Sequence, residues 1–330
     1  MQFLNYPEYS RSMAEKKSTK YWLITGAGGY IGKHVINELL SESIPVVASD
    51  KLPIDCIGDF SSFVKYYEAD LTNSSQIERI FEENVIEGVI HLAALKSVEA
   101  SEKDPSLYRN VNVLGTLNLL RIMEKHKVTR FIFTSSAAVY GELDTGIADE
   151  SARCAPTSNY GRNKLEVEEF LADHNFSRLR YISLRLFNVA GSISSNLRDK
   201  SQDNLIPILF QKLKTDGTMQ IFGSDYQTTD GTACRDFVHV ADVARAYSLG
   251  IKYLNTSNTS KVINIGSGSE TSVMQITRLL AKKLDKSVKI EFCDRRAGDV
   301  GKLIANTQLA QKTLGFKASI SIDEILTSII

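Results

Sequence analysis

The chain has 330 residues, of which 43% are hydrophobic and 24% are charged, an ordinary balance for a globular protein. Basic and acidic residues both number 39, so the formal net charge is zero and no broad basic field exists to attract nucleic acid or an anionic membrane. The four cysteines are scattered without a CxxC pair, which argues against a zinc site or a disulfide framework, and we expect no metal.

The first nineteen residues are polar and charged, without the apolar run that a secretion signal or a membrane span requires. We therefore expect a flexible N-terminal extension over residues 1–19 and a cytoplasmic location.

From residue 21 to about residue 186, apolar runs alternate with amphipathic stretches. The predicted strands are Tyr21–Thr25, Pro45–Ser49, Val64–Glu68, Gly88–Leu92, Arg130–Ser135 and Arg180–Leu186. The predicted helices are Tyr30–Leu40, Ser75–Glu83, Ser106–Lys125 and Tyr160–Asp173. This alternation predicts a Rossmann-like, doubly wound parallel α/β sheet over residues 20–190, with functional residues at the carboxyl ends of its strands.

After Gly191 the alternation breaks down and turn-forming residues accumulate. We predict a second, smaller α/β lobe for the substrate over residues 191–330. Residues 236–250 and 261–267 begin with or contain strand-like runs, and we expect them to return to the first domain.

A glycine-rich turn lies between the first predicted strand and the first predicted helix, with Gly26, Gly29 and Gly32. Side chains at these positions would keep a diphosphate from the helix N-terminus, whose free N–H groups and positive dipole end attract it. Asp50 ends the next strand, where a carboxylate can accept hydrogen bonds from a ribose 2′-hydroxyl and repel a 2′-phosphate. The turn therefore favours NAD over a purely structural role, although adjacent Lys51 softens the discrimination against NADP.

Residues that follow the third and fourth strands extend this interpretation. Asp70 and Leu71 could meet the adenine ring, and capping of the following helix is an equal alternative for Asp70. Leu92, Ala93 and Ala94 are small enough to let the diphosphate and ribose pass.

Tyr160 and Lys164 stand four residues apart, so they share one face of a helix. A phenol ordinarily ionises near pH ~10, and a neighbouring ammonium favours the phenolate, which can then act as a base. An ordinary, partly solvated helix face is the simpler interpretation of the pair alone. Ser136 follows the fifth strand and should lie at the same edge, unless it is only a turn-forming hydroxyl.

Together with the glycine turn, these three residues resemble the extended short-chain dehydrogenase/reductase family. The resemblance implies bound NAD, with Ser136 orienting the substrate, Tyr160 moving the proton and Lys164 holding the nicotinamide ribose. We also expect Lys96, Asn112 and Tyr140 to support the site. The full set of residues expected to bind the cofactor is Gly26, Gly29, Tyr30, Ile31, Gly32, Asp50, Asp70, Leu71, Leu92, Ala93, Ala94, Lys96, Asn112, Tyr160 and Lys164.

Within that family, the segment from Ile221 to Val240 resembles the UDP-galactose (UDP-glucose) 4-epimerases closely. Further matching segments are Leu95–Val98, Leu186–Asn188, Asp203–Pro207 and Arg295–Asp299, so the resemblance runs from about Tyr21 to near the C-terminus. It implies reversible epimerisation at C4 of a UDP-hexose through a 4-keto intermediate, with tightly bound NAD. It also implies a homodimer packed through the helices Ser106–Lys125 and Tyr160–Asp173.

The resemblance assigns substrate contacts to Lys96, Ser136, Tyr160, Asn188, Asn204, Leu205, Phe222, Arg235, Arg296, Asp299 and Leu303. The chemistry of these residue types agrees, because two guanidiniums can neutralise a diphosphate and an aromatic ring can lie against uracil. Taken singly, each arginine is more often part of a surface ion pair and Phe222 a core residue. His239 has no companion ligands at metal spacing, and we interpret it as a packed structural residue.

Several alternatives stay open. Ala137 and Ala138 stand where a dehydratase needs an acid and a base, so elimination is disfavoured. A UDP-N-acetylglucosamine/UDP-N-acetylgalactosamine or UDP-pentose 4-epimerase, an NAD-dependent nucleotide-sugar reductase and a noncatalytic NAD-sensing binding module remain. Leu303 falls at the family position that limits access of N-acetylated sugars and is intermediate in size there, unless it is only a packed strand residue.

Overall fold

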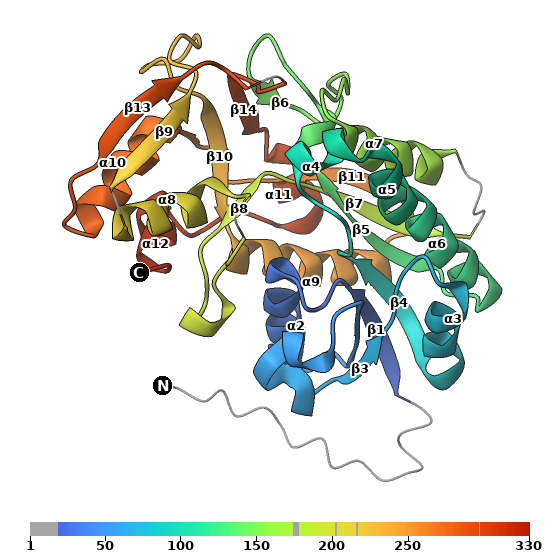
Figure 1. Ribbon diagram of the computed structural model, residues 1–330. Helices are drawn as coiled ribbons and strands as arrows, with labels where there is room; N and C mark the ends of the chain where they lie inside the picture. The colour runs from blue at the N-terminus through green and yellow to red at the C-terminus, as the bar shows by residue number, and fades with distance from the viewer. Residues whose placement is uncertain (1–18, 174–177, 202, 216, 297) are drawn as a thin grey trace.

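The computed structural model describes residues 19–173, 178–201, 203–215, 217–296 and 298–330 (Figure 1). The predicted N-terminal extension, apart from Thr19, lies outside the described residues.

A seven-stranded sheet in the order β11-β7-β5-β4-β1-β2-β3 forms the larger lobe, and every strand pair in it is parallel. Its strands are β1 (Lys20–Thr25), β2 (Val46–Asp50), β3 (Lys65–Glu68), β4 (Val85–His91), β5 (Arg130–Ser136), β7 (Arg180–Leu186) and β11 (Lys261–Ile265). The predicted doubly wound sheet is thus confirmed. The strand order reverses between β1 and β4, and ligands bind such sheets at the carboxyl ends beside this switch point.

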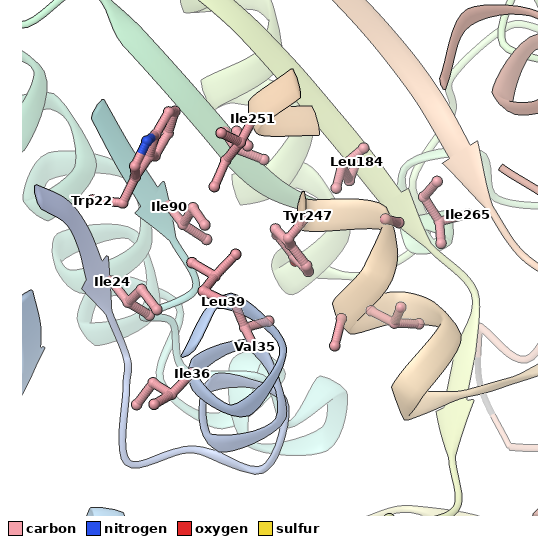
Figure 2. Packing of buried hydrophobic residues seen from close by; sticks show 14 of the residues in the cluster. Trp22, Ile24, Val35, Ile36, Leu39, Ile90, Leu184, Tyr247, Ile251 and Ile265 are labelled. Atoms are coloured by element: carbon pink, nitrogen blue, oxygen red, sulfur yellow. The ribbon is translucent and has the colours of Figure 1, made fainter. Parts of the chain in front are cut away.

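Helices cover both faces of this sheet because its strands are apolar on both sides. In β1, Trp22 and Ile24 point into the core cluster under α2 (Tyr30–Ser41), α9 (Val240–Thr256) and α11 (Gln308–Leu314), as Figure 2 shows for the first two helices. Leu23, between them, points into the opposite cluster under α3 (Ser74–Glu83), α6 (Gly115–Lys125) and α7 (Asn159–Ala172). The period of two residues in a strand produces this division.

The single helix expected over Ser106–Lys125 is divided into three parts. It consists of α5 (Pro105–Arg109), the π-helical turn η2 (Asn110–Leu114) and α6, and it follows an unpredicted short helix, α4 (Val98–Lys103). Short π-helical turns are frequent at functional sites. Here η2 carries Asn112, whose side chain bonds to backbone outside the helix.

The smaller lobe contains two further sheets and lies at the left of Figure 1. The strands of the first are β6 (Ile147–Ala148), β8 (Asn188–Ala190), β10 (Cys234–His239), β12 (Glu270–Ser272) and β14 (Lys302–Ala305); those of the second are β9 (Thr218–Phe222) and β13 (Lys289–Cys293). The remaining elements are α8 (Leu205–Lys214), α10 (Val273–Lys283), α12 (Ile322–Thr327) and the short turns η1 (Ile54–Ser62), η3 (Ala137–Val139) and η4 (Ser195–Leu197).

The two segments expected to return to the first domain behave differently. Strand β11 lies in the large sheet, whereas β10 belongs to the small sheet. The following helix, α9, packs against the large sheet together with Val238 of β10. The domain limits themselves stay a prediction. None of the helices in the described ranges combines the length and the apolar character that a membrane crossing demands.

Candidate active site

A cavity of about 2270 Å³ runs along the carboxyl edge of the large sheet and into the smaller lobe. Pockets for drug-sized ligands measure ~300–1,000 Å³, so this one has room for two large ligands side by side. With the exception of Asn112, every residue predicted to contact the cofactor or the substrate lines it.

Two glycines of the glycine-rich turn lie so close to neighbouring backbone that a side chain would collide with it. Gly26 has a φ of +72°, and a Cβ atom there would stand 2.6 Å from the backbone nitrogen of Ala93. A Cβ atom at Gly32 would stand 2.3 Å from the carbonyl oxygen of Gly26. Helix α2 begins at Tyr30 without a side-chain cap, so its first N–H groups are available to a diphosphate in the cavity.

Asp50 lies at the end of β2, where its carboxylate is oriented by the backbone. Its Oδ2 atom accepts a hydrogen bond of 2.9 Å from the N–H of Gly28, and its Oδ1 atom accepts one of 3.1 Å from the N–H of Leu52. Each carboxylate oxygen has a further lone pair, so the group can still accept hydrogen bonds from a ribose.

Asp70 lies in the turn before α3, but it is not the cap of that helix. The cap is Asn73, whose side chain accepts from the N–H of Gln76. Asp70 instead accepts from the N–H and the hydroxyl of Thr72, and these hydrogen bonds lower the pKa of its carboxyl. It is therefore ionised at neutral pH on the wall of the cavity.

Asn112 is buried and does not line the cavity, so its predicted contact with the cofactor stays a prediction. Its side chain donates to the carbonyl of Leu95 over 2.9 Å and accepts from the N–H of the same residue over 2.8 Å. Because Leu95 precedes Lys96, which lines the cavity, Asn112 positions this wall from behind.

The three predicted catalytic residues come together at the carboxyl end of β5. Ser136 ends that strand, and its side chain is hydrogen-bonded to Tyr160 in the first turn of α7. Ser158 caps α7 by accepting from the N–H of Gly161 over 3.0 Å, which fixes the start of the helix. Lys164, one turn later, is buried, and its Nζ atom lies 5.9 Å from the centroid of the Tyr160 ring.

Burial governs the protonation of both Lys164 and Tyr160. It lowers the pKa of Lys164 to about 7, although the carboxylate of Glu168 opposes the change. Burial likewise raises the pKa of Tyr160, and the hydrogen bond with Ser136 only partly offsets this. The ammonium of Lys164 gives its hydrogen bond to the carbonyl of Thr134, and burial dominates the pKa of Tyr160. The lowering of this pKa by Lys164 together with a positively charged nicotinamide therefore stays a prediction.

The predicted nucleotide-sugar residues line the other end of the cavity. The guanidinium of Arg296 lies over the ring of Phe222, with its Cζ atom 3.8 Å from the ring centroid. Burial lowers the pKa of Arg235, although nearby Asp299 opposes this. The surface ion pair considered for the arginines is instead made by Arg295, which contacts Asp225 over 2.8 Å.

The remaining predicted contacts occupy the walls between these groups. Asn188 begins β8 and is exposed to the cavity, and Asn204 precedes α8, where its side chain donates to Asp199 over 2.6 Å. Leu205 begins α8. Leu303 lies in β14 opposite Arg235, and it is both a packed strand residue and part of the cavity wall.

The cavity also has wall residues that the sequence did not single out, among them Gln220, Phe237 and Val273. The alternation of strand faces could have found the first two. Gln220 stands two residues before Phe222 in β9, and Phe237 stands two residues after Arg235 in β10, so each pair shares one face.

His239 has the packed structural role predicted for it. Its Nδ1 atom accepts from the N–H of Ala241 over 3.0 Å and caps α9. In the described part of the chain, no group of three or more His, Cys, Asp or Glu side chains is arranged to hold a metal ion.

The model of the NAD dependent epimerase/dehydratase family matches residues 22–266. The chain belongs to this family. It is 36% identical over 300 residues to the UDP-glucose 4-epimerase of Halalkalibacterium halodurans, covering 89% of this chain and 90% of that protein. It is also 35% identical to the bifunctional protein gal10 of Schizosaccharomyces pombe, a longer protein of which the chain spans 46%.

A solved structure agrees with the family assignment. The UDP-glucose 4-epimerase of Stenotrophomonas maltophila, with bound NAD and formylated UDP-arabinopyranose, superposes with a TM-score of 0.89 at 33% identity. The match covers 94% of this chain and 96% of that one. The chain thus belongs to an NAD-dependent enzyme family, and the binding of NAD by the glycine turn and Asp50 stays a prediction.

Proposed function

We propose that the chain interconverts UDP-galactose and UDP-glucose by reversible epimerisation at C4, with NAD held throughout the turnover. The observation that carries this proposal is the lining of one cavity by three groups of residues. These groups are the glycine-rich turn, the set of Ser136, Tyr160 and Lys164, and the pair of Phe222 and Arg296. The similarity to UDP-glucose 4-epimerases over nine-tenths of the chain supports the same reaction.

In the proposed mechanism, Tyr160 takes the proton from the 4-hydroxyl of the sugar, and Ser136 holds that hydroxyl through its Oγ atom. When bound, NAD supplies the oxidant and later the reductant for C4, and its nicotinamide adds a positive charge to the site. Lys164, while protonated, stabilises the phenolate of Tyr160 and offers its remaining N–H donors to the cofactor ribose. The proton returns from Tyr160 to the oxygen when the 4-keto sugar is reduced.

The anchoring residues must hold the UDP group while the keto sugar turns its other face to the cofactor. We assign this role to Arg235 and Arg296, which can bind the diphosphate, and to Phe222, which can lie against the uracil. Asn188, Asn204, Leu205 and Asp299 complete the proposed UDP contacts.

The decisive experiment is to incubate the purified protein with UDP-galactose without added NAD and to separate the nucleotide sugars by chromatography. We expect UDP-glucose to accumulate to an equilibrium mixture, because the cofactor is regenerated in each turnover. If the reaction instead requires added dinucleotide and consumes one dinucleotide for each sugar converted, the protein is a nucleotide-sugar reductase. If protein that carries NAD converts no sugar, the remaining interpretation is the noncatalytic NAD-sensing module.

Substrate breadth depends on the wall that contains Leu303. This residue packs with Ala137 and Phe187 in an apolar cluster that borders the cavity. A leucine leaves more room than a tyrosine, so UDP-N-acetylglucosamine and UDP-N-acetylgalactosamine are proposed secondary substrates. A UDP-pentose is also a candidate, since the Stenotrophomonas protein was solved with formylated UDP-arabinopyranose. Comparing kcat/KM for these sugars with that for UDP-galactose tests both.

We also propose that the protein is a cytoplasmic homodimer. Leu107 and Leu114 are 48% and 45% exposed on the α5–η2–α6 segment, beside α7. Two such faces packed together would bury these apolar side chains. Sedimentation of the wild type should give twice the monomer mass. The double variant with Leu107→Asp and Leu114→Asp should sediment with the mass of a monomer. The cytoplasmic location is checked by fractionation.

A further inference from the structure

An ion pair between Arg185 and Glu168 is buried behind the catalytic residues, and the mechanism above does not use it. The two side chains are 6% and 4% exposed, and Nη2 of the arginine lies 2.6 Å from Oε2 of the glutamate. Nε of the same arginine donates to both carboxylate oxygens over 3.1 Å. Such a pair contributes little net stability, because burial removes both charges from water. Its presence behind the site therefore calls for another explanation.

The pair connects the two segments that carry the catalytic side chains. Glu168 lies on α7 with Tyr160 and Lys164, while Arg185 lies on β7 and its Cζ atom is 4.8 Å from the centroid of the Tyr140 ring. Tyr140 follows η3, the turn directly after Ser136. The guanidinium thus contacts both sides of the site.

A further hydrogen-bond chain holds this arrangement in place. The hydroxyl of Tyr140 donates to Oδ1 of Asn264 on β11 over 2.6 Å. The side-chain amide of Asn264 in turn donates to the carbonyl of Ala148 on β6 over 3.0 Å. Glu150 accepts from the backbone N–H of Asn264 over 2.8 Å. Neither ring nor guanidinium is therefore free to move without breaking several buried hydrogen bonds.

Glu168 is also well placed to act on Lys164, because it follows that lysine by one helical turn on the same face. Among the described residues, the other groups around the ammonium bring no formal negative charge. His91 on β4 is neutral, because burial lowers its pKa to about 3. The carbonyl of Thr134 on β5 accepts a hydrogen bond from the ammonium. From α7 itself comes Tyr160, and the hydroxyl of Tyr247 on α9 is bonded to Thr134.

We propose that the Arg185–Glu168 pair is a positioning element of the catalytic site. Glu168 favours the charged form of Lys164, and Arg185 holds both the carboxylate and helix α7 in register. Neither residue lines the cavity. The inference rests on the roles proposed above for Tyr160 and Lys164.

The first test is Glu168→Gln, compared with Glu169→Gln, the same change at the next residue of α7, which is exposed. Removing the carboxylate lowers the pKa of Lys164 further, so the ammonium loses its proton at a lower pH. The alkaline limb of the kcat profile should then move down by roughly one pH unit. At pH 8, kcat should fall about tenfold while KM for UDP-galactose is unchanged. Glu169→Gln should leave both values unaltered.

The second test is the double variant Glu168→Leu with Arg185→Met, which replaces the pair by apolar side chains. Such replacements are often neutral for stability, so this variant keeps the experiment decisive if Glu168→Gln folds poorly. We expect normal thermal unfolding and a normal content of bound NAD, together with the shifted pH profile. A wild-type pH profile in the double variant would overturn the proposal, since the pair would then serve packing alone.

Tyr160→Phe separates this inference from the function on which it rests. Full activity of Tyr160→Phe would remove the proposed base and with it both proposals. An inactive Tyr160→Phe, combined with a Glu168→Gln variant that behaves like Glu169→Gln, would leave the proposed function standing and reject only the role of the ion pair.

Discussion

Lys164 donates a hydrogen bond of 2.7 Å from its Nζ atom to the carbonyl oxygen of Thr134, the residue two before Ser136 in β5. The same atom lies 4.9 Å from the centroid of the Phe133 ring. One side of the ammonium is thus fixed by the strand that ends in the catalytic serine. Its two other N–H donors are left for the cavity, which the residue lines.

Lys164→Met should abolish turnover but stabilise the fold at low pH. The pKa of this lysine is about 7 in the folded protein against an ordinary value of 10.5, so the unfolded chain binds its proton more tightly. Burying the charge therefore lowers the free energy of unfolding by its full amount below pH 7. This loss of stability disappears as the pH rises towards 10.5. The free energy of unfolding of Lys164→Met should therefore exceed that of the wild type by about a few kcal/mol at pH 6 and by less at pH 9.

Urea unfolding of both proteins at the two pH values checks this prediction. Lys312→Met, a change at an exposed lysine of α11, serves as the control and should show no such pH dependence. A gap between Lys164→Met and the wild type that is equal at pH 6 and pH 9 would contradict the argument.

Ser136→Ala should lower kcat by about 100-fold, the effect of one positioned acid–base partner. The hydrogen bond between this serine and Tyr160 lowers the pKa of the phenol, so its loss leaves the effect of burial unopposed. The optimum of the kcat profile should consequently move to higher pH. Ser183→Ala, a buried serine of the adjacent strand β7, is the matched control and should retain wild-type kinetics. An unshifted optimum in Ser136→Ala would show that the two hydroxyls do not communicate.

The larger lobe could be predicted from the sequence because its signals are local. Apolar runs, glycines between a strand and a helix, and a Tyr and a Lys at helical spacing all act within a few residues of one another. The π-helical turn at Asn112 could not be predicted in this way, because it depends on hydrogen bonds to Leu95, seventeen positions earlier. Short strands such as β6, with two residues, are held by tertiary pairing with β14 and leave no periodic pattern.

The limits of prediction at the site have the same origin. Residue types identified Tyr160 and Lys164, but their protonation is decided by burial, which is a property of the folded chain. Val273 reaches the cavity only because the start of α10 faces it, and nothing in its immediate neighbours marks it as functional.

Asp50→Asn should reduce NAD binding about 10- to 100-fold and weaken discrimination against NADP. The carboxylate already accepts from the N–H groups of Gly28 and Leu52, and hydrogen bonds to a charged group contribute about 1.5–3 kcal/mol each. The amide has one acceptor oxygen instead of two and no charge to repel a 2′-phosphate, while Lys51 beside it attracts one. Fluorescence titrations with NAD and with NADP give the two dissociation constants and their ratio. A preference as strong as that of the wild type would locate the discrimination elsewhere.

Arg296→Lys should raise KM for UDP-galactose about tenfold with little change in kcat, as for a residue that binds substrate and transition state equally. The planar guanidinium both lies on the Phe222 ring and offers several N–H donors, whereas a lysine offers a point charge. Arg295→Lys is the matched control, because that side chain pairs with Asp225 and does not line the cavity. An equal effect of both substitutions on KM would mean that only the local positive charge matters.

Acid should destabilise the fold through His91, whose imidazole is enclosed between two threonines. Its Nε2 atom lies 2.8 Å from the hydroxyl of Thr116, which donates its own proton to the carbonyl of Asn112. The imidazole therefore carries its hydrogen on Nε2, and Nδ1 accepts from the hydroxyl of Thr25 over 2.7 Å. Burial disfavours the charged imidazolium and the nearby ammonium of Lys164 adds to this effect, so the pKa of His91 is lowered from 6.5 to about 3.

Between pH 6.5 and about 3, the unfolded chain binds a proton at this histidine that the folded chain does not bind, so stability falls as the pH falls. His91→Asn should lower the stability at pH 7 because its hydrogen bonds are lost. It should also reduce the slope of unfolding free energy against pH, between pH 5.5 and 4, by about 1.4 kcal/mol per pH unit. Denaturant unfolding across that range measures the slope, and a slope identical to that of the wild type would mean that His91 is protonated in the fold. Because Thr25 directly precedes the glycine turn, bound NAD should be released over the same range in the wild type.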